Sequence, residues 1–475
     1  MSKLQRLICG VWNEVRATTP SVQGNFSRKM KPETSSRRPP GPKSRFSGVS
    51  LLMRRDMLGL LERMARDYGD ASSLEASFGP LFFFNHPDAV REVLQTQADC
   101  FVKSRALEFA KLLLGEGLLT SEVPRHRRQR QLMQPAFHHK RVQSYAASMT
   151  HYAAQMGGKW QAGAVVDMHH EMMALTLAIV GKTLFNTEVG EETEVVERAM
   201  NAVMPLFDRA FLPWGELLNR LPLPATNRFN RAKAALNSTI YRIIAEHKAS
   251  GDVGDLVSML LLAQDEEGAH MSDAQVRDEA LTIFLAGHET TANALTYTWH
   301  LLAQNPDVEA KLHAELDAVL KGRDATLEDV GNLTYTQMVF YEAMRLYPPA
   351  WALGRRAIRD CEIFGYSVPK DAIVLVSQWT MHRDARFWPD PLEFRPERFD
   401  EAAKAERPKF AYFPFGSGPR TCIGESFAMM EAALLIATLA QEWWAVAVSS
   451  QPLKLQPLIT LRPAHPVKMR LERRS

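Results

Sequence analysis

The sequence has few cysteines and no long apolar run. Four cysteines among 475 residues are too few for a disulfide framework, so we expect a protein of a reducing compartment. The longest apolar run near the start, residues 7–12, is far shorter than the about 20 residues that cross a bilayer. It is also too short for a secretory signal. We therefore expect neither a disulfide-stapled fold nor a membrane-spanning one.

An excess of one charge is also missing. The chain carries 57 basic and 54 acidic residues, a formal net charge of +3, which is too close to balance to predict nucleic-acid binding. Hydrophobic residues make up 46% and charged residues 23%, values typical of globular proteins. These proportions exclude a collagen, a wholly disordered chain and a polytopic membrane protein.

The basic residues are concentrated at the start of the chain. Residues 1–45 hold ten lysines and arginines against Glu14 and Glu33, and they end in a proline-rich run, where regular structure is disfavoured. We predict that residues 1–45 form a disordered leader. Two alternatives are contact with an anionic membrane surface and an Arg-rich transit peptide; we do not expect the membrane contact.

Helical periodicity dominates the rest of the chain. The pattern predicts one helix over residues 273–302, capped by Ser272, and another over 427–441. It predicts strands near 74–84, after Pro348–Pro349, and at 458–461 and 467–471, with a turn at 365–369. Because no interior linker divides residues 46–475, we predict one large, mainly α-helical domain with a minor β region.

The strongest chemical signal is a Gly/Pro-rich loop, residues 413–424, that leads into the apolar helix. It contains Cys422, and a thiolate is both a nucleophile and a metal ligand whose pKa falls at a helix N-terminus. The glycines at 416, 418 and 424 let the backbone approach a flat cofactor and direct amide groups toward the sulfur. On this chemistry alone, a buried structural cysteine is an equal alternative. Zinc is disfavoured because no Cys or His lies at ligand spacing nearby.

This loop resembles the haem-binding signature of the cytochrome P450 family, and the five matching positions are Phe415, Gly418, Arg420, Cys422 and Gly424. The resemblance implies a single large P450 fold, a triangular-prism helical domain with small sheets, over residues 46–475. It further implies haem b (iron protoporphyrin IX), with Cys422 as the thiolate ligand of the iron and Arg420 paired with a haem propionate. Thiolate ligation favours O–O cleavage.

A second match lies upstream. Glu342 and Arg345 stand three positions apart on one helix face and resemble the family's E-x-x-R motif, while residues 394–399 resemble its partner segment. The resemblance implies a buried ion triad of Glu342, Arg345 and Arg398 behind the haem. We assign these residues a structural role, because such networks fix geometry more than they add stability.

The long helix contains a third motif, Ala286 to Thr291. Glycine inside a helix costs about 1 kcal/mol relative to alanine, so Gly287 needs a reason; we expect it to open a groove. Thr290 is expected to bond back to a nearby carbonyl and distort the helix. The stretch resembles the family's oxygen-activation motif, which implies that Glu289 is the proton-donating acid and Thr290 the alcohol. The alternative is a kinked helix with a solvated glutamate.

Haem propionates need cationic partners, and arginine suits them best. Arg355 stands where the family commonly has one. Residues 124–137 resemble the family's third helix, in which a tryptophan usually precedes an arginine by four positions; here His126 takes the first position and Arg130 the second. The rest of this basic stretch is expected to be a solvated face, or else a docking site for an acidic redox protein.

The resemblance implies a monooxygenase that inserts one oxygen atom of O2 into a lipophilic molecule, by hydroxylation or epoxidation. No flavin or nicotinamide signature is present, so electrons are expected from a ferredoxin or flavodoxin with its NAD(P)H reductase. A monomeric, soluble, cytoplasmic protein of bacterial type is expected. The alternatives are a peroxide-driven or non-oxygenating haem-thiolate enzyme on the same scaffold, and a haem protein without catalysis.

By family position, four apolar stretches are expected to line the substrate pocket. They are a loop from Phe101 to Leu114, residues 284–286, residues 350–353 and residues 459–461. Apolar lining is typical of such pockets, so fatty acids, terpenoids, steroids and polyketides all remain candidates. Lys103 and Arg105 are expected to face solvent, because unpaired cations are rarely buried.

Overall fold

The structure is a computed structural model that describes residues 37–42, 53, 55–76, 78–186, 221–251, 253–264, 268–449 and 451–474. Its helices are α3 (Met57–Tyr68), α4 (Pro87–Arg91), α5 (Arg105–Leu114), α6 (Arg125–Met133), α7 (His139–Ser144), α8 (Ala146–Lys159), α9 (Met168–Phe185), α12 (Pro224–Ser250), α13 (Leu256–Leu262), α14 (Asp273–Leu302), α15 (Pro306–Leu320), α16 (Thr334–Leu346), α17 (Gln378–Met381), α18 (Glu401–Glu406) and α19 (Glu425–Glu442).

Its strands are short and lie in separate sheets. They are β1 (Ala71–Ala76), β2 (Gly79–Phe84), β3 (Phe101–Lys103), β4 (Val165–Asp167), β5 (Leu353–Ala357), β6 (Cys361–Ile363), β7 (Tyr366–Val368), β8 (Ile373–Val376), β9 (Trp443–Ala447), β10 (Leu455–Pro457), β11 (Leu461–Pro463) and β12 (Lys468–Arg473). The mainly α-helical fold with a minor β region is confirmed.

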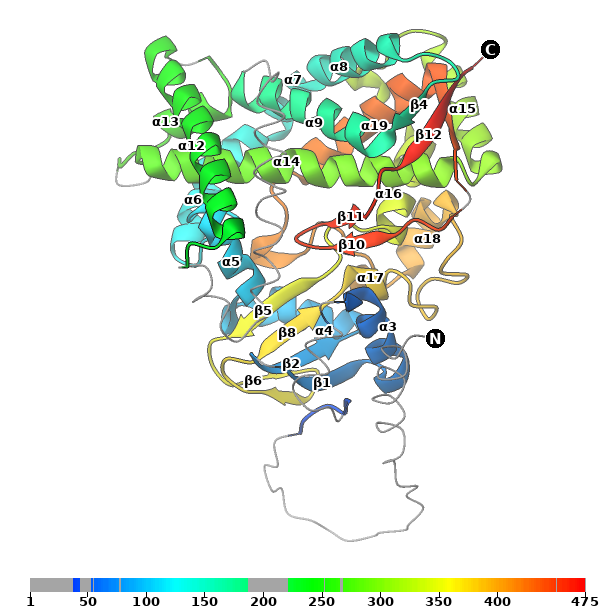
Figure 1. Ribbon diagram of the computed structural model, residues 1–475. Coiled ribbons are helices and arrows are strands. Elements are labelled where there is room, and N and C mark those ends of the chain that lie inside the picture. Colours follow the sequence, from blue (N-terminus) through cyan, green and yellow to red (C-terminus); the bar gives the residue numbers. More distant parts are fainter. Residues whose placement is uncertain are drawn as a thin grey trace.

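Helix α14 crosses the whole molecule and separates two regions (Figure 1). Above it in this view lie α7, α8, α9, α15 and α19, and below it lie hairpin β10–β11 and the largest sheet. The helix spans the predicted residues, 273–302, and its predicted cap, Ser272, accepts a hydrogen bond from the Gln275 backbone N at 3.3 Å. Most of its side chains are buried on all sides, as expected of a central helix.

The largest sheet has the strand order β1-β2-β8-β5-β3. Strand β2 pairs with β8 in parallel and with β1 antiparallel. The single strand predicted over 74–84 is therefore wrong, because a tight connection folds this stretch into the hairpin β1–β2, where Gly79 has φ +116°. Such a conformation favours glycine. The aromatic run Phe82–Phe84 of β2 is fully buried and anchors the sheet in its core.

Other local predictions also need correction. The stretch expected as a loop over Phe101–Leu114 is strand β3 followed by helix α5, because its apolar residues recur at helical spacing and bury one face. The predicted strand over 458–461 is mainly the turn that joins β10 to β11. The predicted turn over 365–369 is instead centred on Phe364 and Gly365, which both have positive φ, and Tyr366–Val368 is strand β7.

Part of the predicted leader lies against the sheet. Of residues 1–45, the structure describes 37–42. The Pro40 carbonyl accepts a hydrogen bond from the Ser73 backbone N at 2.9 Å, and the Arg37 carbonyl accepts one from Ser367 N at 3.0 Å. Residues 37–42 therefore have backbone hydrogen-bond partners in strands β1 and β7. The remaining leader residues lie outside the described ranges.

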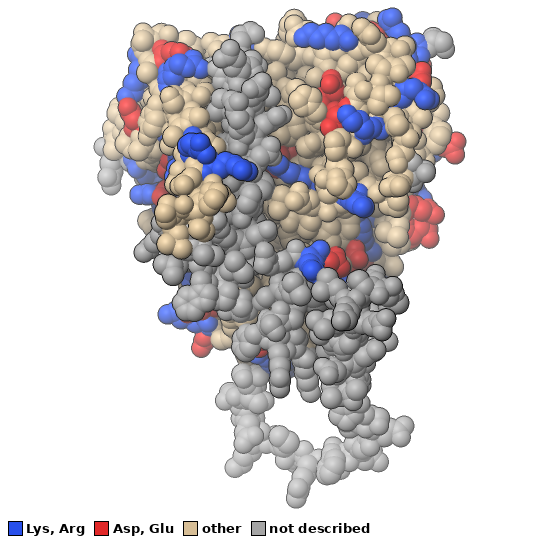
Figure 2. Space-filling model, viewed as in Figure 1, with Lys and Arg blue, Asp and Glu red and all other residues tan. Residues whose placement is uncertain are grey.

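Across the described residues, no helix has both the length and the apolar character that crossing a membrane requires. The face of the molecule in Figure 2 carries lysine and arginine side chains interspersed with aspartate and glutamate.

Candidate active site

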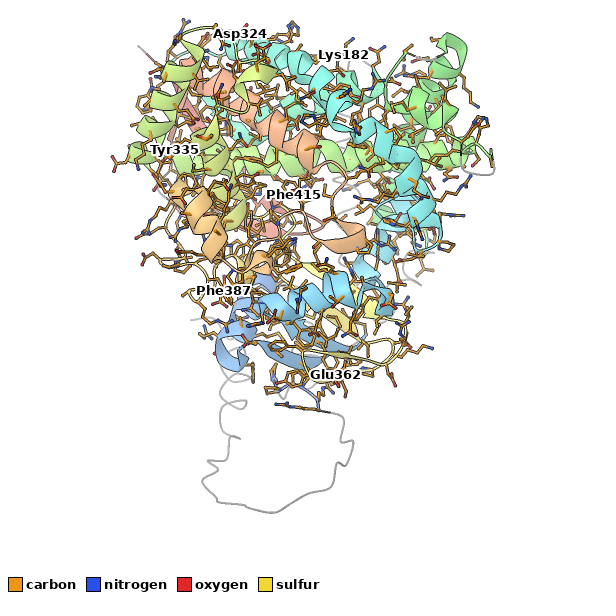
Figure 3. All side chains as sticks on the ribbon, turned by 180° about the vertical axis from the view of Figure 1, so that it is seen from behind. Lys182, Asp324, Tyr335, Glu362, Phe387 and Phe415 are labelled. Carbon is orange, nitrogen blue, oxygen red and sulfur yellow. The ribbon has the colours of Figure 1, made fainter. Side chains whose placement is uncertain are left out.

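The Cys422 loop is fixed between the helices and the large sheet. The Cys422 backbone N donates to the Phe415 carbonyl at 2.9 Å, which closes the loop on itself, and Phe415 lies near the middle of the molecule (Figure 3). Gly418 has φ +70°, and a Cβ there would stand 2.1 Å from the Leu94 carbonyl oxygen. Only glycine fits this position, since both the backbone conformation and the close approach exclude a side chain.

The Cys422 thiol faces an interior space. Its surface is accessible, yet burial raises its pKa, while a hydrogen bond from the Gly424 backbone acts in the opposite direction. Accessibility together with burial means that the thiol is open to a space enclosed by protein rather than to bulk water. A thiol in such a place stays protonated until a cation replaces its proton, and a bound metal ion does this outright.

Cationic side chains gather beside this loop. Burial, and then the charge of Arg420, lowers the pKa of Lys103 to about 6, that of His126 to about 3 and that of Arg355 to about 10. The carboxylate that opposes these shifts at Lys103 and Arg355 is that of Glu122. At pH 7 these values leave Lys103 and His126 largely uncharged and Arg355 charged, so an anion placed here would be attracted by the arginines and would favour the protonated form of Lys103. The two propionates of a haem are such anions, so the residues fit the cofactor.

Arg420 and Arg130 connect the cysteine loop to helix α6 and to the residues just before that helix. Arg420 donates to the Ser121 carbonyl at 2.8 Å and to Glu122 Oε2 at 2.5 Å. Arg130 Nη1 donates to the Thr421 carbonyl, one residue before Cys422, at 2.7 Å. The structure brings Arg130, Arg355, Arg420 and the buried His126 to one region, together with Glu122, which the sequence analysis did not single out.

Lys103 corrects a prediction. The residue was expected to face solvent, but it is only 6% exposed, and its ammonium donates to the Leu118 carbonyl at 3.1 Å and to that of Leu119. It lies on β3 opposite Arg355 of β5. Antiparallel pairing across 252 positions of sequence is what buries it, and no local pattern predicts such a pair. Arg105 is half-buried.

Helix α14 presents an open face near its middle. Ala286 is exposed and Thr290 half-buried, although the neighbouring side chains are buried. Thr290 Oγ1 donates to the Ala286 carbonyl at 2.9 Å, as predicted, yet the helix continues without a break. A Cβ at Gly287 would stand 3.2 Å from Val180 Cγ2 of α9. Gly287 therefore allows α9 to pack closely on α14, and the predicted groove is not what explains it.

Glu289 lies in a buried ion pair. It is 3% exposed, accepts from Arg462 Nε at 2.6 Å and also accepts from the Thr460 hydroxyl. Burial alone would raise its pKa, but the charge of Arg462 and these hydrogen bonds lower it. The alternative of a solvated glutamate is wrong. The sequence gave no sign of Arg462, because the two residues are 173 positions apart.

The predicted ion triad is formed. Glu342 and Arg345 are both fully buried and make two hydrogen bonds of 2.6 and 2.8 Å. Arg398 Nε lies 3.4 Å from Glu342 Oε1. Arg345 also donates to the carbonyls of His382, Pro391 and Glu393. Helix α16 is thus fastened to the segment that leads toward the cysteine loop.

The expected pocket residues are not equally placed to meet a substrate. Phe284, Leu285 and Leu461 are buried in apolar clusters, and the Phe284 ring packs on Phe185 with centroids 5.2 Å apart. Trp351 and Ile459 are half-buried. Trp351 Nε1 donates to the Leu458 carbonyl at 2.9 Å, which joins the chain segments that contain these two stretches.

A depression of about 310 Å³ opens at the surface beside the cysteine loop. Its lining includes Phe413–Gly416 of the loop itself and three basic residues, Lys404, Arg407 and Lys409. The Arg407 guanidinium stacks on Trp388, 3.9 Å from the ring centroid. A surface with several basic side chains attracts acidic proteins.

Comparison with known proteins identifies the class. Residues 39–469 match the family model described as cytochrome P450, so the chain belongs to the cytochrome P450 family. It is 40% identical over 429 residues to cyclooctatin synthase of Streptomyces melanosporofaciens, covering 89% of this chain and 93% of that protein. It is 37% identical to cyclooctat-9-en-7-ol 5-monooxygenase of the same organism, covering 78% and 82%.

A third relative is pentalenene oxygenase of Streptomyces avermitilis, which is 34% identical over 391 residues and covers 81% of this chain and 86% of that protein. The chain is accordingly an oxygen-incorporating oxidoreductase, a haem-thiolate monooxygenase that acts on a lipophilic organic substrate. The bound haem supplies the activation of O2, and its reactivity depends on the thiolate ligand.

Proposed function

We propose that the cofactor is haem b, that Cys422 ligates its iron, and that Arg130, Arg355 and Arg420 neutralise its propionates, with the neutral His126 donating a hydrogen bond. Lys103 joins this set. The observation that carries the proposal is the cluster of buried basic side chains, opposed by the carboxylate of Glu122, beside an accessible cysteine. Phe415, Gly418 and Gly424 shape the loop, while Ala286 and Gly287 form the facing surface of α14.

The proposed substrate is a cyclic terpenoid, either a hydrocarbon or an alcohol. Two relatives are named for pentalenene and for cyclooctat-9-en-7-ol, and the half-buried side chains of the expected wall, such as Trp351 and Ile459, are apolar. An apolar pocket with few polar groups holds such a molecule by area burial. Fatty acids and steroids become the competing outcomes of the test.

Thr290 and Glu289 are proposed to handle the protons of the reaction. The Thr290 hydroxyl, on the open face of α14, orients a proton donor toward the oxygen to be protonated. Glu289, adjacent in sequence, takes protons from solvent and hands them on. The remaining protein groups hold the substrate and keep bulk water out of the site.

Replacing the ligand tests the cofactor assignment. In Cys422→Ala we expect haem binding to weaken and the optical features of thiolate ligation to disappear, because alanine offers the metal no electron pair. Cys100→Ala and Cys361→Ala are matched controls and should leave the spectrum unchanged. Unaltered haem-thiolate features in Cys422→Ala would refute the assignment.

An optical titration tests the substrate class. The purified ferric protein is titrated with cyclic terpene hydrocarbons and alcohols, fatty acids, steroids and aromatic polyketides, and the spin-state change is followed. We expect a saturable change with terpenoids. A change with fatty acids or steroids alone would overturn the terpenoid proposal while leaving the monooxygenase class intact.

The proposed electron donor is an acidic ferredoxin or flavodoxin with its NAD(P)H reductase, docking on the depression that contains Lys404, Arg407 and Lys409. The depression borders the cysteine loop, so the path of an electron from the donor through Phe415 and Cys422 to the haem would be short. This position differs from the basic stretch at residues 124–130, which the sequence offered as an alternative docking site while favouring a solvated face. We propose further that the protein is a cytoplasmic monomer.

Charge reversal tests the docking site. Lys404→Glu and Lys409→Glu should slow reduction by the donor about tenfold at low salt, with little effect at high salt, because steering by charge is screened. Lys370→Glu, an exposed site beyond β7, makes the same change of charge far from the loop and should have little effect. Equal slowing by all three variants would reject the docking site.

A further inference from the structure

The C-terminal hairpin reaches the middle of α14. Hairpin β10–β11 lies directly under the long helix (Figure 1), and strand β11 contacts it. Its turn and second strand bring Thr460 and Arg462 to Glu289. The Tyr297 hydroxyl of α14 also donates to the Leu461 carbonyl at 2.9 Å. The acid is therefore held by an element that comes more than 170 positions later in the chain.

The hydrogen bonds around Glu289 all point the same way. His169 Nε2 lies 3.0 Å from Asn293 Oδ1. Because an amide oxygen only accepts hydrogen bonds, the imidazole is the donor. Asn293 Nδ2 donates to Thr460 Oγ1 at 3.4 Å, and the Thr460 hydroxyl donates to Glu289. A chain in which each member donates toward the carboxylate stabilises its charged form.

Arg462 supplies the charge opposite Glu289. The other titratable groups that interact with Glu289 are His169 of α9, and His288 and Tyr297 of α14 itself. Burial lowers the pKa of both histidines and raises that of the tyrosine, so these three are neutral near pH 7. Among the described groups that act on Glu289, the positive charge near neutral pH comes from Arg462.

The hairpin is itself fixed to the expected pocket wall. The Leu461 backbone N donates to the Pro349 carbonyl at 2.8 Å, and the Leu458 carbonyl accepts from the Trp351 indole at 2.9 Å. The same hairpin thus touches the segment expected to meet substrate and the acid expected to deliver protons. The hairpin therefore connects the Glu289 carboxylate to the expected pocket wall.

From this geometry we propose that Arg462, assisted by Thr460, is a positioning residue that keeps Glu289 ionised and aligned for proton delivery. The inference rests on the proposed proton-handling role of Glu289 and adds the group that controls it. Glu289 must accept a proton from solvent before passing it on, and a carboxylate held in the charged form is ready to accept one. Without Arg462, burial would favour the neutral acid.

The test uses the haem-loaded ferric protein without substrate. Infrared titration between pH 5 and 9 follows the C=O band of a protonated carboxyl, and the difference from Glu289→Gln assigns it to Glu289. In wild type we expect no such band near pH 7. In Arg462→Met the band should be present at pH 7 and disappear as the pH is raised. Arg462→Lys retains the charge and should behave like wild type.

A turnover measurement follows the consequence. Product formed per electron should fall about tenfold in Arg462→Met, with the electrons appearing as hydrogen peroxide, and should acquire a pH dependence that Glu289→Gln lacks. Arg473→Met, which removes an exposed arginine of β12 paired with Glu442 at 3.5 Å, is the matched control. Thr460→Val removes one hydrogen-bond donor to Glu289, so the band of the protonated carboxyl should appear, with a smaller intensity than in Arg462→Met.

Each result decides the matter. The absence of a Glu289 C=O band at pH 7 in Arg462→Met, as in wild type, overturns the inference, even if turnover proceeds normally. If Arg462→Met fails to fold, the absence of the protonated-carboxyl band in Thr460→Val overturns the inference. Failure of every substrate and donor would instead overturn the proposed function, and the infrared result would stand on its own.

Discussion

Arg420, two residues before Cys422, donates to the Glu122 carboxylate at 2.5 Å. Glu122 also accepts from the Lys103 backbone N at 2.7 Å, so a single carboxylate joins the cysteine loop to strand β3. If Arg420 pairs with a haem propionate as proposed, it divides its donors between Glu122 and the cofactor. Glu122 partly offsets the positive charge that the site presents to propionates.

Glu122→Gln should make the midpoint potential of the haem more positive. Removing a negative charge near the iron destabilises the more positive ferric state relative to the ferrous one. Potentiometric titration of the purified protein measures the shift. Glu116→Gln, a half-exposed partner of Lys111 at 2.9 Å, is the control and should have little effect. A more negative potential in Glu122→Gln would contradict the argument.

Thr290→Ala should divert electrons from product to hydrogen peroxide. The hydroxyl that orients the proton donor is lost, while the helix retains its backbone hydrogen bonds, so we expect product per electron to fall about tenfold with little change in substrate affinity. Simultaneous assay of product and peroxide measures this. Thr290→Ser should restore most of the coupling. Thr291→Ala, whose hydroxyl bonds to the Gly287 carbonyl at 3.4 Å, should leave it unchanged.

Glu342→Gln should destabilise the fold strongly. The substitution leaves the guanidinium of Arg345, which is fully buried, without its charged partner, and breaking a buried pair costs about 3–5 kcal/mol. The free energy of unfolding, measured with denaturant, should fall by about that amount. Glu401→Gln removes an exposed partner of Lys404 and should cost less than about 1 kcal/mol. Equal effects would mean that the triad is energetically unimportant.

Glu279 should make stability depend on pH. Burial raises the pKa of this carboxyl, which accepts from the Leu118 backbone N at 2.7 Å, to about 8 from an ordinary value of 4.5. The folded state then binds the proton more tightly than the unfolded state, so this group lowers stability progressively as the pH rises from 4.5 to about 8.

Glu279→Gln cannot ionise and can still accept the hydrogen bond. We expect its melting temperature to exceed that of wild type by more at pH 9 than at pH 6. Thermal unfolding at both values, with Glu116→Gln as a control for surface charge, measures the difference. A constant difference between the two pH values would show that Glu279 does not titrate in this window.

The sequence alone predicted those features that residues close together in the chain form. The cysteine loop needs glycine at 418 because backbone and neighbour exclude a side chain, and helix α14 begins after Ser272, as its cap predicted. The acidic and basic members of the triad were also correctly brought together, since Glu342 and Arg345 are three positions apart on one helix.

Tertiary structure decided which charges are buried and what they face. The sequence predicted that Lys103 faces solvent, but the pairing of β3 with β5 buries it. Gly287 allows α9 to pack closely on α14. Residues 105–114 form a helix that buries one face. The partner of Glu289 comes from 173 positions away. Sequence periodicity reports only local geometry, whereas the ionisation of Glu289 depends on a countercharge that the folded chain alone brings into contact.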